Sequence, residues 1–295
     1  MVAGLGLVAC GSSGKGHSGR TSGGATPPGS PAAPASSSAS TTAGLADVGL
    51  FLNLGDSIAS GVNVPSGLAY RDLLFANDAG HPAYDRRDLA TRAAGLALRD
   101  DAVPGLTSQE VLDRARALSA SWPEPPGTRS VLVSVSMGGN DLLRDVGTNA
   151  GLLSAGWARS KGAALRANWE ALIGLLRARF AGRRVVIVGQ TLYDLTDGTG
   201  QLPPGLTGFG CADFYQAIAL AGGALPAQNL ELVNEATRGA LRDEGALLAD
   251  TWRRFQGHGI ASRDPYLSGR DCIHPNEEGH HQIRRAIWEA LTGEP

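Results

Sequence analysis

The residues best suited to chemistry are a serine near the start of the apolar, globular part of the chain and a histidine near its end. Ser57 is the third residue of Gly-Asp-Ser-Ile at 55–58, which directly follows the apolar run 50–54. A short apolar run that stops at a glycine predicts a buried strand entering a tight turn. Open α/β sheets bind ligands at the carboxyl ends of their strands, so Ser57 is predicted to lie at a ligand site. Its hydroxyl is a weak nucleophile that needs a base and oxyanion donors.

A base for this serine is indicated by Asp271 and His274, which stand three positions apart shortly before the last predicted helix. In a turn, this spacing lets the carboxylate accept a hydrogen bond from the imidazole, orient the ring and stabilise its protonated form. A single histidine is more often structural. The aspartate partner, in a chain with a serine at a strand end, favours a catalytic role for His274.

Two further turns contain glycines and follow predicted strands. Gly105 stands between a predicted strand at 96–103 and a predicted helix, which is a natural place for an exposed backbone N–H. Taken alone, Gly105 would be an ordinary turn glycine. The apolar strand 131–135 leads into Gly-Gly-Asn-Asp at 138–141, where two glycines let the backbone pack tightly and turn a polar side chain inward.

Taken together and in chain order, these four segments resemble the four sequence blocks of the SGNH hydrolases, also called GDSL lipases and esterases. The resemblance implies that Ser57 is the nucleophile and also donates its backbone N–H to the oxyanion. Gly105 would supply a second N–H and Asn140 a side-chain amide donor. His274 would act as general base and then as acid for the leaving alcohol, while Asp271 orients it. Four blocks in the right order are a specific signal, although each alone would be weak.

The resemblance extends from about residue 50 to about residue 285, with small departures. Ile58 stands where leucine is common in the family, and Asp100 stands where an asparagine often precedes the second block. Neither position has a catalytic role, but Asp100 could alter local hydrogen bonding. The elbow Gly-x-Ser-x-Gly of the α/β-hydrolases is absent, because Ala59 occupies its last position.

Predicted strands alternate with predicted helices along the chain. This alternation predicts an α/β domain with a mostly parallel central sheet covered on both faces, a three-layer α/β/α sandwich. The resemblance implies the flavodoxin-like fold of the SGNH hydrolases. The expected strands are 48–54, 96–103, 131–135, 185–188 and 246–249, and the expected helices include 70–76, 163–179, 226–243 and 276–291. Residues 77–92 contain a polar segment and are expected to form a solvated loop.

The bulk properties narrow the possible partners. The 295 residues are 42% hydrophobic and 18% charged, with a formal net charge of -2 and no basic block, so nucleic acid is not an expected partner. No apolar run is long enough for a transmembrane helix. We expect a monomer whose substrate is a small-molecule, lipid or glycan ester. The family resemblance implies hydrolysis through an acyl-enzyme without cofactor or metal.

Histidines other than His274 could suggest a metal site. His280 and His281 lie in the last predicted helix, close to His274 and Glu277. Neither His-Glu-x-x-His nor His-x-x-Glu-His is present, so we expect these two histidines to lie on the surface or in helix packing, and no metal site.

The first 44 residues differ in composition from the rest. Residues 1–9 are apolar and leader-like but lack a basic start, and Cys10 ends Leu-Val-Ala-Cys, which resembles the lipobox of bacterial lipoproteins. The alternative is an incidental cysteine in a frayed terminus. Residues 10–44 are rich in Gly, Ser, Ala and Pro and are expected to be a disordered tether, with the hydrolase domain at 45–295. We therefore expect an extracytoplasmic protein, secreted or held on a bacterial membrane by a lipid on Cys10.

Export would make Cys211 and Cys272 a possible disulfide. Closing this loop of 61 positions would stabilise the fold by roughly 4 kcal/mol in the chain-entropy model. A bridge at Cys272 would also brace the loop that holds His274. Two buried free thiols are the alternative.

Two other functions remain open at this point. The family also contains carbohydrate O-deacetylases, which act on envelope or extracellular polysaccharide. A non-catalytic surface lipoprotein of the same fold ranks lower, because such proteins usually lack a residue of the triad and Ser57, Asp271 and His274 are all present.

Overall fold

A sheet of five parallel strands forms the centre of the domain. The structure, a computed structural model, describes residues 44–145, 154–197 and 227–295. Among these residues the strand order is β2-β1-β3-β4-β5, and every neighbouring pair is parallel. After β1 the chain first adds β2 on one side and then adds β3, β4 and β5 on the other side. The carboxyl ends of β1 and β3 are therefore the topological switch point where such sheets bind ligands. The strands are β1 (Val48–Gly55), β2 (Ala97–Asp100), β3 (Ser130–Ser136), β4 (Val185–Gln190) and β5 (Leu247–Ala249).

The strand β1 is buried along its whole length because helices cover both faces of the sheet. Its alternate side chains enter two separate cores. Leu50, Leu52 and Leu54 lie in one core, and Val48 and Phe51 lie in the other. The apolar run at 50–54 thus belongs to a strand that is buried on both faces of the sheet.

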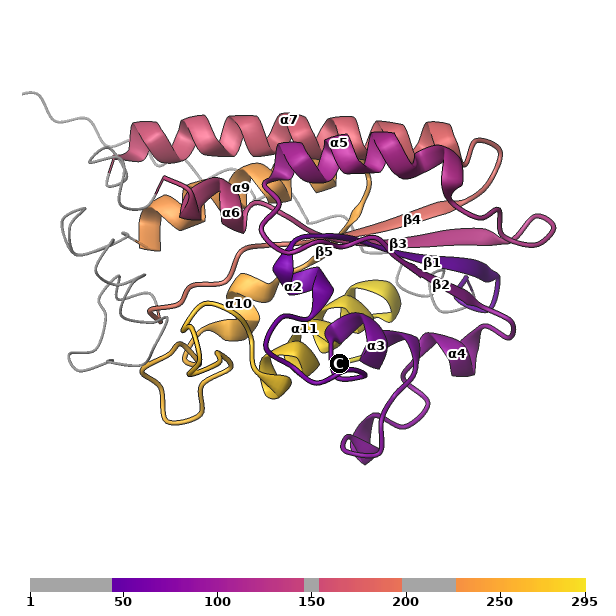
Figure 1. The fold of residues 1–295 in the computed structure, drawn as a ribbon, viewed down its shortest axis with the longest axis horizontal. Coiled ribbons are helices and arrows are strands. Elements are labelled where there is room, and N and C mark those ends of the chain that lie inside the picture. The colour runs from indigo at the N-terminus through magenta and orange to yellow at the C-terminus, as the bar shows by residue number, and fades with distance from the viewer. Residues whose placement is uncertain (1–43, 146–153, 198–226) are drawn as a thin grey trace, which may run out of the picture. The chain divides into compact units, whose positions relative to one another are not determined.

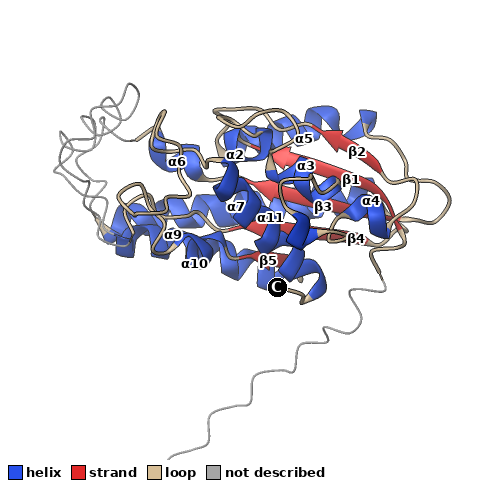
Figure 2. Cartoon of the chain, turned by 90° about the horizontal axis from the view of Figure 1, so that it is seen from below, coloured by secondary structure: helices blue, strands red, loops and turns tan. Residues whose placement is uncertain are grey.

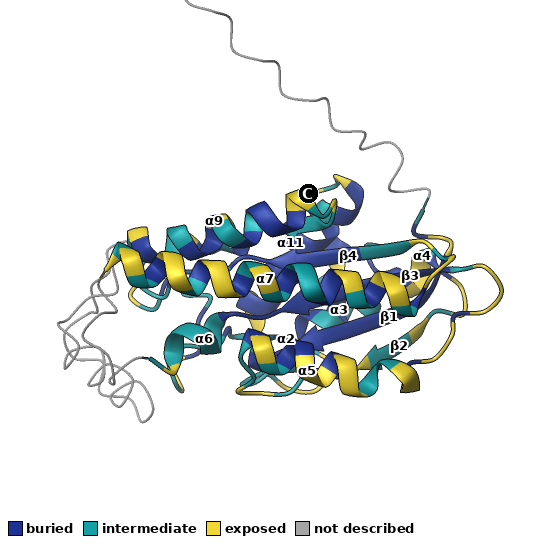
Figure 3. Ribbon diagram, turned by 90° about the horizontal axis from the view of Figure 1, so that it is seen from above, coloured by how far each residue is buried: buried dark blue, intermediate teal, exposed yellow. Residues whose placement is uncertain are grey.

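Helices form the two outer layers (Figure 1). One face of the sheet packs against α5 (Ser108–Leu118), α7 (Ala155–Arg179) and α9 (Ala227–Asp243). The other face packs against α3 (Tyr70–Phe75), α10 (Thr251–Phe255) and α11 (Glu277–Thr292). Figure 3 shows exposed residues along the outer side of α7 and α5 and buried strands beneath them. The predicted three-layer α/β/α fold is confirmed.

Short elements connect these layers. Figure 2 shows the shorter helices among the loops that surround the strands. They are α2 (Ser57–Ser60), η1 (Pro82–Tyr84), α4 (Leu89–Arg92), η2 (Ser119–Ser121) and α6 (Gly139–Leu143). Because α2 and α6 directly follow β1 and β3, they lie at the carboxyl edge of the sheet. No helix in the described ranges combines the length and apolarity needed to cross a bilayer.

Two predicted boundaries were wrong. The helix expected from residue 163 begins at Ala155, because the Ser154 side chain accepts a hydrogen bond from Trp157 N–H and caps an earlier start. The strand expected at 96–103 covers only Ala97–Asp100. Beyond Asp100 the N–H groups of Asp101 and Val103 still donate to carbonyl oxygens of β1, but the segment no longer has regular strand geometry.

The segment 77–92 packs on the domain through buried residues such as Tyr84, while Asp85 and Arg86 within it are exposed, as expected. It contains η1 and α4, and Tyr84 within it is buried against α11. Arg285 Nε donates to the Tyr84 hydroxyl at 2.6 Å, and the His281 ring meets the Tyr84 ring edge-on. Sequence reasoning missed this docking, because the aromatic and cationic partners lie about 200 positions apart.

Two adjacent histidines of α11 are buried and neutral. Tyr70 N–H donates to His280 Nδ1 at 3.2 Å, and Arg284 Nη2 lies 2.7 Å from His281 Nδ1. Burial lowers the pKa of each histidine to about 3, and the charge of Arg284 also lowers that of His281. Both rings pack within the fold, as the sequence allowed.

These two histidines predict acid-sensitive stability. Between about pH 6.5 and about pH 3, His280 and His281 are protonated in the unfolded chain but stay neutral in the folded protein. The free energy of unfolding therefore falls as the pH drops through this range. Each contributes up to about 1.4 kcal/mol per pH unit. Asp56 acts in the opposite sense, because burial raises its pKa to about 6 and its contribution is lost as the pH rises through that value.

The substitution His280→Gln keeps an acceptor for the N–H of Tyr70 and removes the titrating ring. We expect urea unfolding of this variant at a series of pH values between 6.5 and 5 to show a flatter decline in the free energy of unfolding than the unmodified protein. An equal decline in both proteins would contradict the burial argument.

Candidate active site

The turn that carries Ser57 is held between the ends of β1 and β3. Asp56 caps α2 by accepting a hydrogen bond from Ile58 N–H at 3.0 Å and a second one from Ser136 Oγ at 3.1 Å. Gly55 has φ 138°, and a Cβ at that position would lie 2.1 Å from the carbonyl oxygen of Ser136. Only glycine fits this close approach of the two strands. Ser57 is therefore fixed as the first residue of α2 at the carboxyl end of β1.

The carboxyl group next to Ser57 has unusual electrostatics. Asp56 is 2% exposed, and this burial raises its pKa to about 6. Hydrogen bonds from Ile58 and Ser136 and the nearby His274 oppose the rise without cancelling it. Asp56 is therefore partly protonated at mildly acidic pH, where an exposed aspartate would be fully ionised.

Asp271 and His274 form the hydrogen-bonded pair that their spacing predicts. His274 Nδ1 lies 2.5 Å from Asp271 Oδ2, and Asp271 Oδ1 accepts hydrogen bonds from the N–H groups of Ile273 and His274, each at 3.0 Å. Burial raises the pKa of Asp271, but these hydrogen bonds outweigh it and hold the pKa well below its usual range. Asp271 is thus a carboxylate at neutral pH. It fixes the proton of the imidazole on Nδ1 and leaves Nε2 as the acceptor.

The loop of this pair is anchored to the sheet by a tyrosine. The hydroxyl of Tyr193 donates to the carbonyl oxygen of Ile273 at 2.7 Å, and its ring stacks on Phe255 with centroids 4.6 Å apart. Within the loop, Ser268 N–H donates to the carbonyl oxygen of His274 at 2.8 Å. Sequence reasoning missed Tyr193. Its one signal is its position just after β4, at the same carboxyl edge as Ser57.

The predicted oxyanion donors lie in loops that contact each other. Asn140 Nδ2 donates to the carbonyl oxygen of Leu106 at 2.9 Å, which leaves one of its two amide hydrogens for another acceptor. Gly105 has φ 84° and is exposed, and its carbonyl oxygen accepts a hydrogen bond from Arg144 Nη2 at 2.9 Å. Within the described residues, the N–H groups of Ser57 and Gly105 donate to no other residue.

Asp141, which follows Asn140, links the loop of Gly105 to the loop of Asn140 through hydrogen bonds. Asp141 accepts hydrogen bonds from the N–H and the Oγ of Ser108, at 2.7 Å and 2.6 Å. Ser108 is fully buried and its Oγ also accepts a hydrogen bond from Asn168 Nδ2 of α7 at 2.8 Å. The start of α5, which follows Gly105, is thereby fixed to α6, which carries Asn140.

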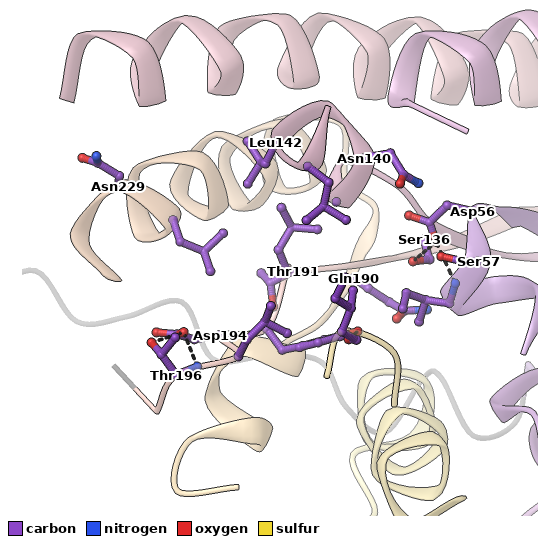
Figure 4. Close-up of a pocket in the computed structure, with 18 of the residues that line it drawn as sticks. Asp56, Ser57, Ser136, Asn140, Leu142, Gln190, Thr191, Asp194, Thr196 and Asn229 are labelled. Carbon is purple, nitrogen blue, oxygen red and sulfur yellow. Dashed lines mark hydrogen bonds between the residues drawn. The ribbon is translucent and has the colours of Figure 1, made fainter. Parts of the chain in front are cut away.

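A pocket of about 120 Å³ opens beside Ser57 (Figure 4). Figure 4 shows Ser57 and Asn140 at one end of it and Asn229, Asp194 and Thr196 at the other. Large apolar side chains also line the pocket: Leu142, Leu143, Trp157, Leu192, Leu195 and Leu230. The hydroxyl of Ser57 and the side-chain amide of Asn140 therefore border a mainly apolar cavity.

The structure brings two of the predicted site residues, Asp271 and His274, into contact and places two others, Ser57 and Asn140, on the wall of one pocket. Ser57 and Asn140 line one pocket with Ile273, the neighbour of His274. The described residues contain no hydrogen bond between Ser57 Oγ and His274; such bonds often tighten only when substrate binds. Asn63, which the sequence did not indicate, donates from Nδ2 to Asp271 Oδ2 at 2.7 Å.

The cysteine predictions fall largely outside the described residues. Cys10 and Cys211 are not described, and neither are the predicted leader at 1–9 and nearly all of the tether at 10–44. Cys272 is buried, with φ 60°, between Asp271 and His274. The Cys211–Cys272 disulfide and the lipid anchor at Cys10 therefore stay predictions.

Comparison with known proteins gives one family and one fold. A family model described as the GDSL-like Lipase/Acylhydrolase family matches residues 54–282. This range contains every residue of the site described above. A search of curated proteins by sequence gave no match.

The fold is similar to that of several solved structures. A lipolytic G-D-S-L family protein from Veillonella parvula has a TM-score of 0.52 and 14% identity, over 82% of this chain and 98% of that chain. An extracellular lipase from Streptomyces rimosus has a TM-score of 0.51 and 20% identity, over 82% and 99%. Phospholipase A1 from Streptomyces albidoflavus has a TM-score of 0.50 and 22% identity, over 82% and 99%. At these identities the likeness shows the fold.

The contact at Gly55 predicts a large cost for any side chain there. We expect Gly55→Ala to lower the free energy of unfolding by about 3 kcal/mol or more, because its Cβ would collide with the backbone of Ser136. Gly67→Ala is the matched control: Gly67 also has a positive φ, at 90°, but open space around it, so only the backbone strain of about 1–2 kcal/mol applies. Equal costs in urea unfolding would contradict the strand contact.

Proposed function

This chain belongs to the GDSL-like lipase/acylhydrolase family of ester hydrolases, and we propose that it cleaves carboxylic esters with Ser57 as a covalent nucleophile. The observation that carries the proposal is the hydrogen bond of 2.5 Å between His274 and Asp271, in the loop whose Ile273 lines the same pocket as Ser57. A base oriented by a carboxylate, beside a serine at a strand end, is the arrangement that activates a hydroxyl.

The proposed reaction has two halves. Ser57 Oγ attacks the carbonyl carbon of the ester while its proton passes to His274 Nε2, and the imidazolium then gives that proton to the departing alcohol. The oxyanion accepts hydrogen bonds from the N–H groups of Ser57 and Gly105 and from Asn140 Nδ2. In the second half, His274 takes a proton from water, the hydroxide attacks the acyl-enzyme, and Ser57 regains its proton as the acid leaves.

The apolar pocket indicates which part of the substrate it receives. Leu142, Leu143 and Trp157 would shield an alkyl chain from water, which favours acyl groups longer than acetyl. A carbohydrate O-deacetylase removes only an acetyl group and does not need a long apolar pocket. The activity series below tests this alternative directly.

The substitution Ser57→Ala tests the nucleophile. Ser57 Oγ makes no hydrogen bond within the described residues, so the fold and thermal midpoint should be unchanged. We expect turnover of short and medium acyl esters to fall by about 1000-fold or more. Ser121→Ala, an exposed serine in η2, is the control and should keep full activity. Full activity in Ser57→Ala would overturn the proposal.

The substitution Leu142→Trp tests the acyl pocket. The larger side chain should fill the cavity next to Asn140 and lower kcat/KM for long acyl esters by about tenfold or more, while acetyl esters change little. The measurement is an acyl-length series of aryl esters together with acetylated glycans. A preference for acetylated glycans, unaltered by Leu142→Trp, would favour the O-deacetylase instead.

A further inference from the structure

We propose that Asn63 is a positioning residue that holds Asp271, and through it His274, in register with Ser57; the inference rests on the proposed function. Asn63 Nδ2 donates to Asp271 Oδ2 at 2.7 Å across 208 positions of sequence. The same carboxylate oxygen lies 2.5 Å from His274 Nδ1. Asn63 thus contacts the atom that orients the base.

The position of Asn63 in the chain explains how it links the two halves of the site. It follows Ser57 by only six residues, and the intervening turn is tightly bonded: the N–H groups of Gly61 and Val62 both donate to the carbonyl oxygen of Ser57 at 3.1 Å. These two bonds fix the geometry of the turn between Ser57 and Asn63. Its bond to Asp271 connects the segment that bears the nucleophile with the loop that bears the base.

The backbone at Asn63 is arranged so that its side chain reaches Asp271. Asn63 has φ 74°, in the left-handed region that asparagine tolerates better than other non-glycine residues. This conformation fits asparagine and glycine, but only asparagine supplies the amide donor. Glycine at this position would keep the backbone and remove the hydrogen bond.

The hydrogen bond has an electrostatic consequence. The two oxygens of Asp271 accept bonds from the N–H groups of Ile273 and His274, from the imidazole, and from Asn63. The amide of Asn63 takes up part of the negative charge that otherwise stabilises the imidazolium. Asn63 therefore shares Oδ2 of Asp271 with the imidazole and restricts the rotation of the carboxylate.

Other titratable groups surround the pair. Asp56 precedes α2, Tyr193 follows β4 and lies near Asp271, and His280 of α11 lies near His274. Arg71 of α3 acts on His280. All four are unchanged when Asn63 is replaced, so a difference between variants reports the pair itself.

The test compares Asn63→Gly and Asn63→Asp with the full-length protein. We expect each to lower kcat by about tenfold with KM little changed, as for loss of one hydrogen bond to a charged group. The acid limb of kcat/KM should move to higher pH, further in Asn63→Asp, because a second carboxylate stabilises the imidazolium more. Arg86→Gly, at an exposed residue with φ 61°, is the control for glycine in a left-handed position and should change neither quantity.

A double-mutant cycle with Asp271→Asn completes the test. Because Asn63 acts through Asp271, adding Asn63→Gly to Asp271→Asn should lower kcat less than twofold further. If Asn63→Gly still lowers kcat tenfold when Asp271 has already been replaced, Asn63 has a merely structural role and the inference is overturned. A loss of activity in the Asn63 variants that is equal at every pH would overturn it as well. If Asn63→Gly fails to fold, Asn63→Asp has the same shape and decides alone. Absence of esterase activity in the unmodified protein would instead reject the proposed function.

Discussion

The close contact between the carboxyl ends of β1 and β3 determines the geometry of the whole site. Gly55 lets the two backbones approach, and the hydrogen bond from Ser136 to Asp56 fixes the turn that follows. Because this contact lies at the switch point of the sheet, it places Ser57, at the end of one strand, next to the loop of Asn140 at the end of the other. Ser57 and Asn140 both line the pocket directly from the turns that follow β1 and β3.

His274 comes from the far end of the sequence, so long-range contacts must hold its loop at the pocket. Tyr193 holds the backbone of the loop through Ile273, and Asn63 holds the carboxylate of Asp271. The first contact comes from the end of β4 and the second from the segment that follows Ser57. Two independent anchors on one short loop restrict both its position and the rotation of its acid.

The sequence predicted those features that are written in short-range patterns. The apolar run before Ser57, the spacing of Asp271 and His274, and the alternation of strands and helices each need only a few neighbouring residues. Asn63 and Tyr193 could not be found in this way. Each is a single polar residue in a loop, and its partner lies 208 or 80 positions away.

The errors in the secondary structure have the same origin. The first turns of α7 contain small residues that blur the helical period, and the start of the helix depends on one capping contact of Ser154. The segment 77–92 contains several charged residues, but one of them, Asp88, is buried and accepts hydrogen bonds from the N–H and the Oγ1 of Thr91. Burial of polar groups through specific partners is a tertiary property that composition does not reveal.

The central claim is that a single serine forms a covalent intermediate. The most direct measurement is peptide mapping by mass spectrometry after the full-length protein has reacted with a fluorophosphonate. The account predicts one adduct, on the peptide that contains Ser57, with loss of ester hydrolysis in proportion to labelling. An adduct on another residue, or hydrolysis that persists in fully labelled protein, would contradict it.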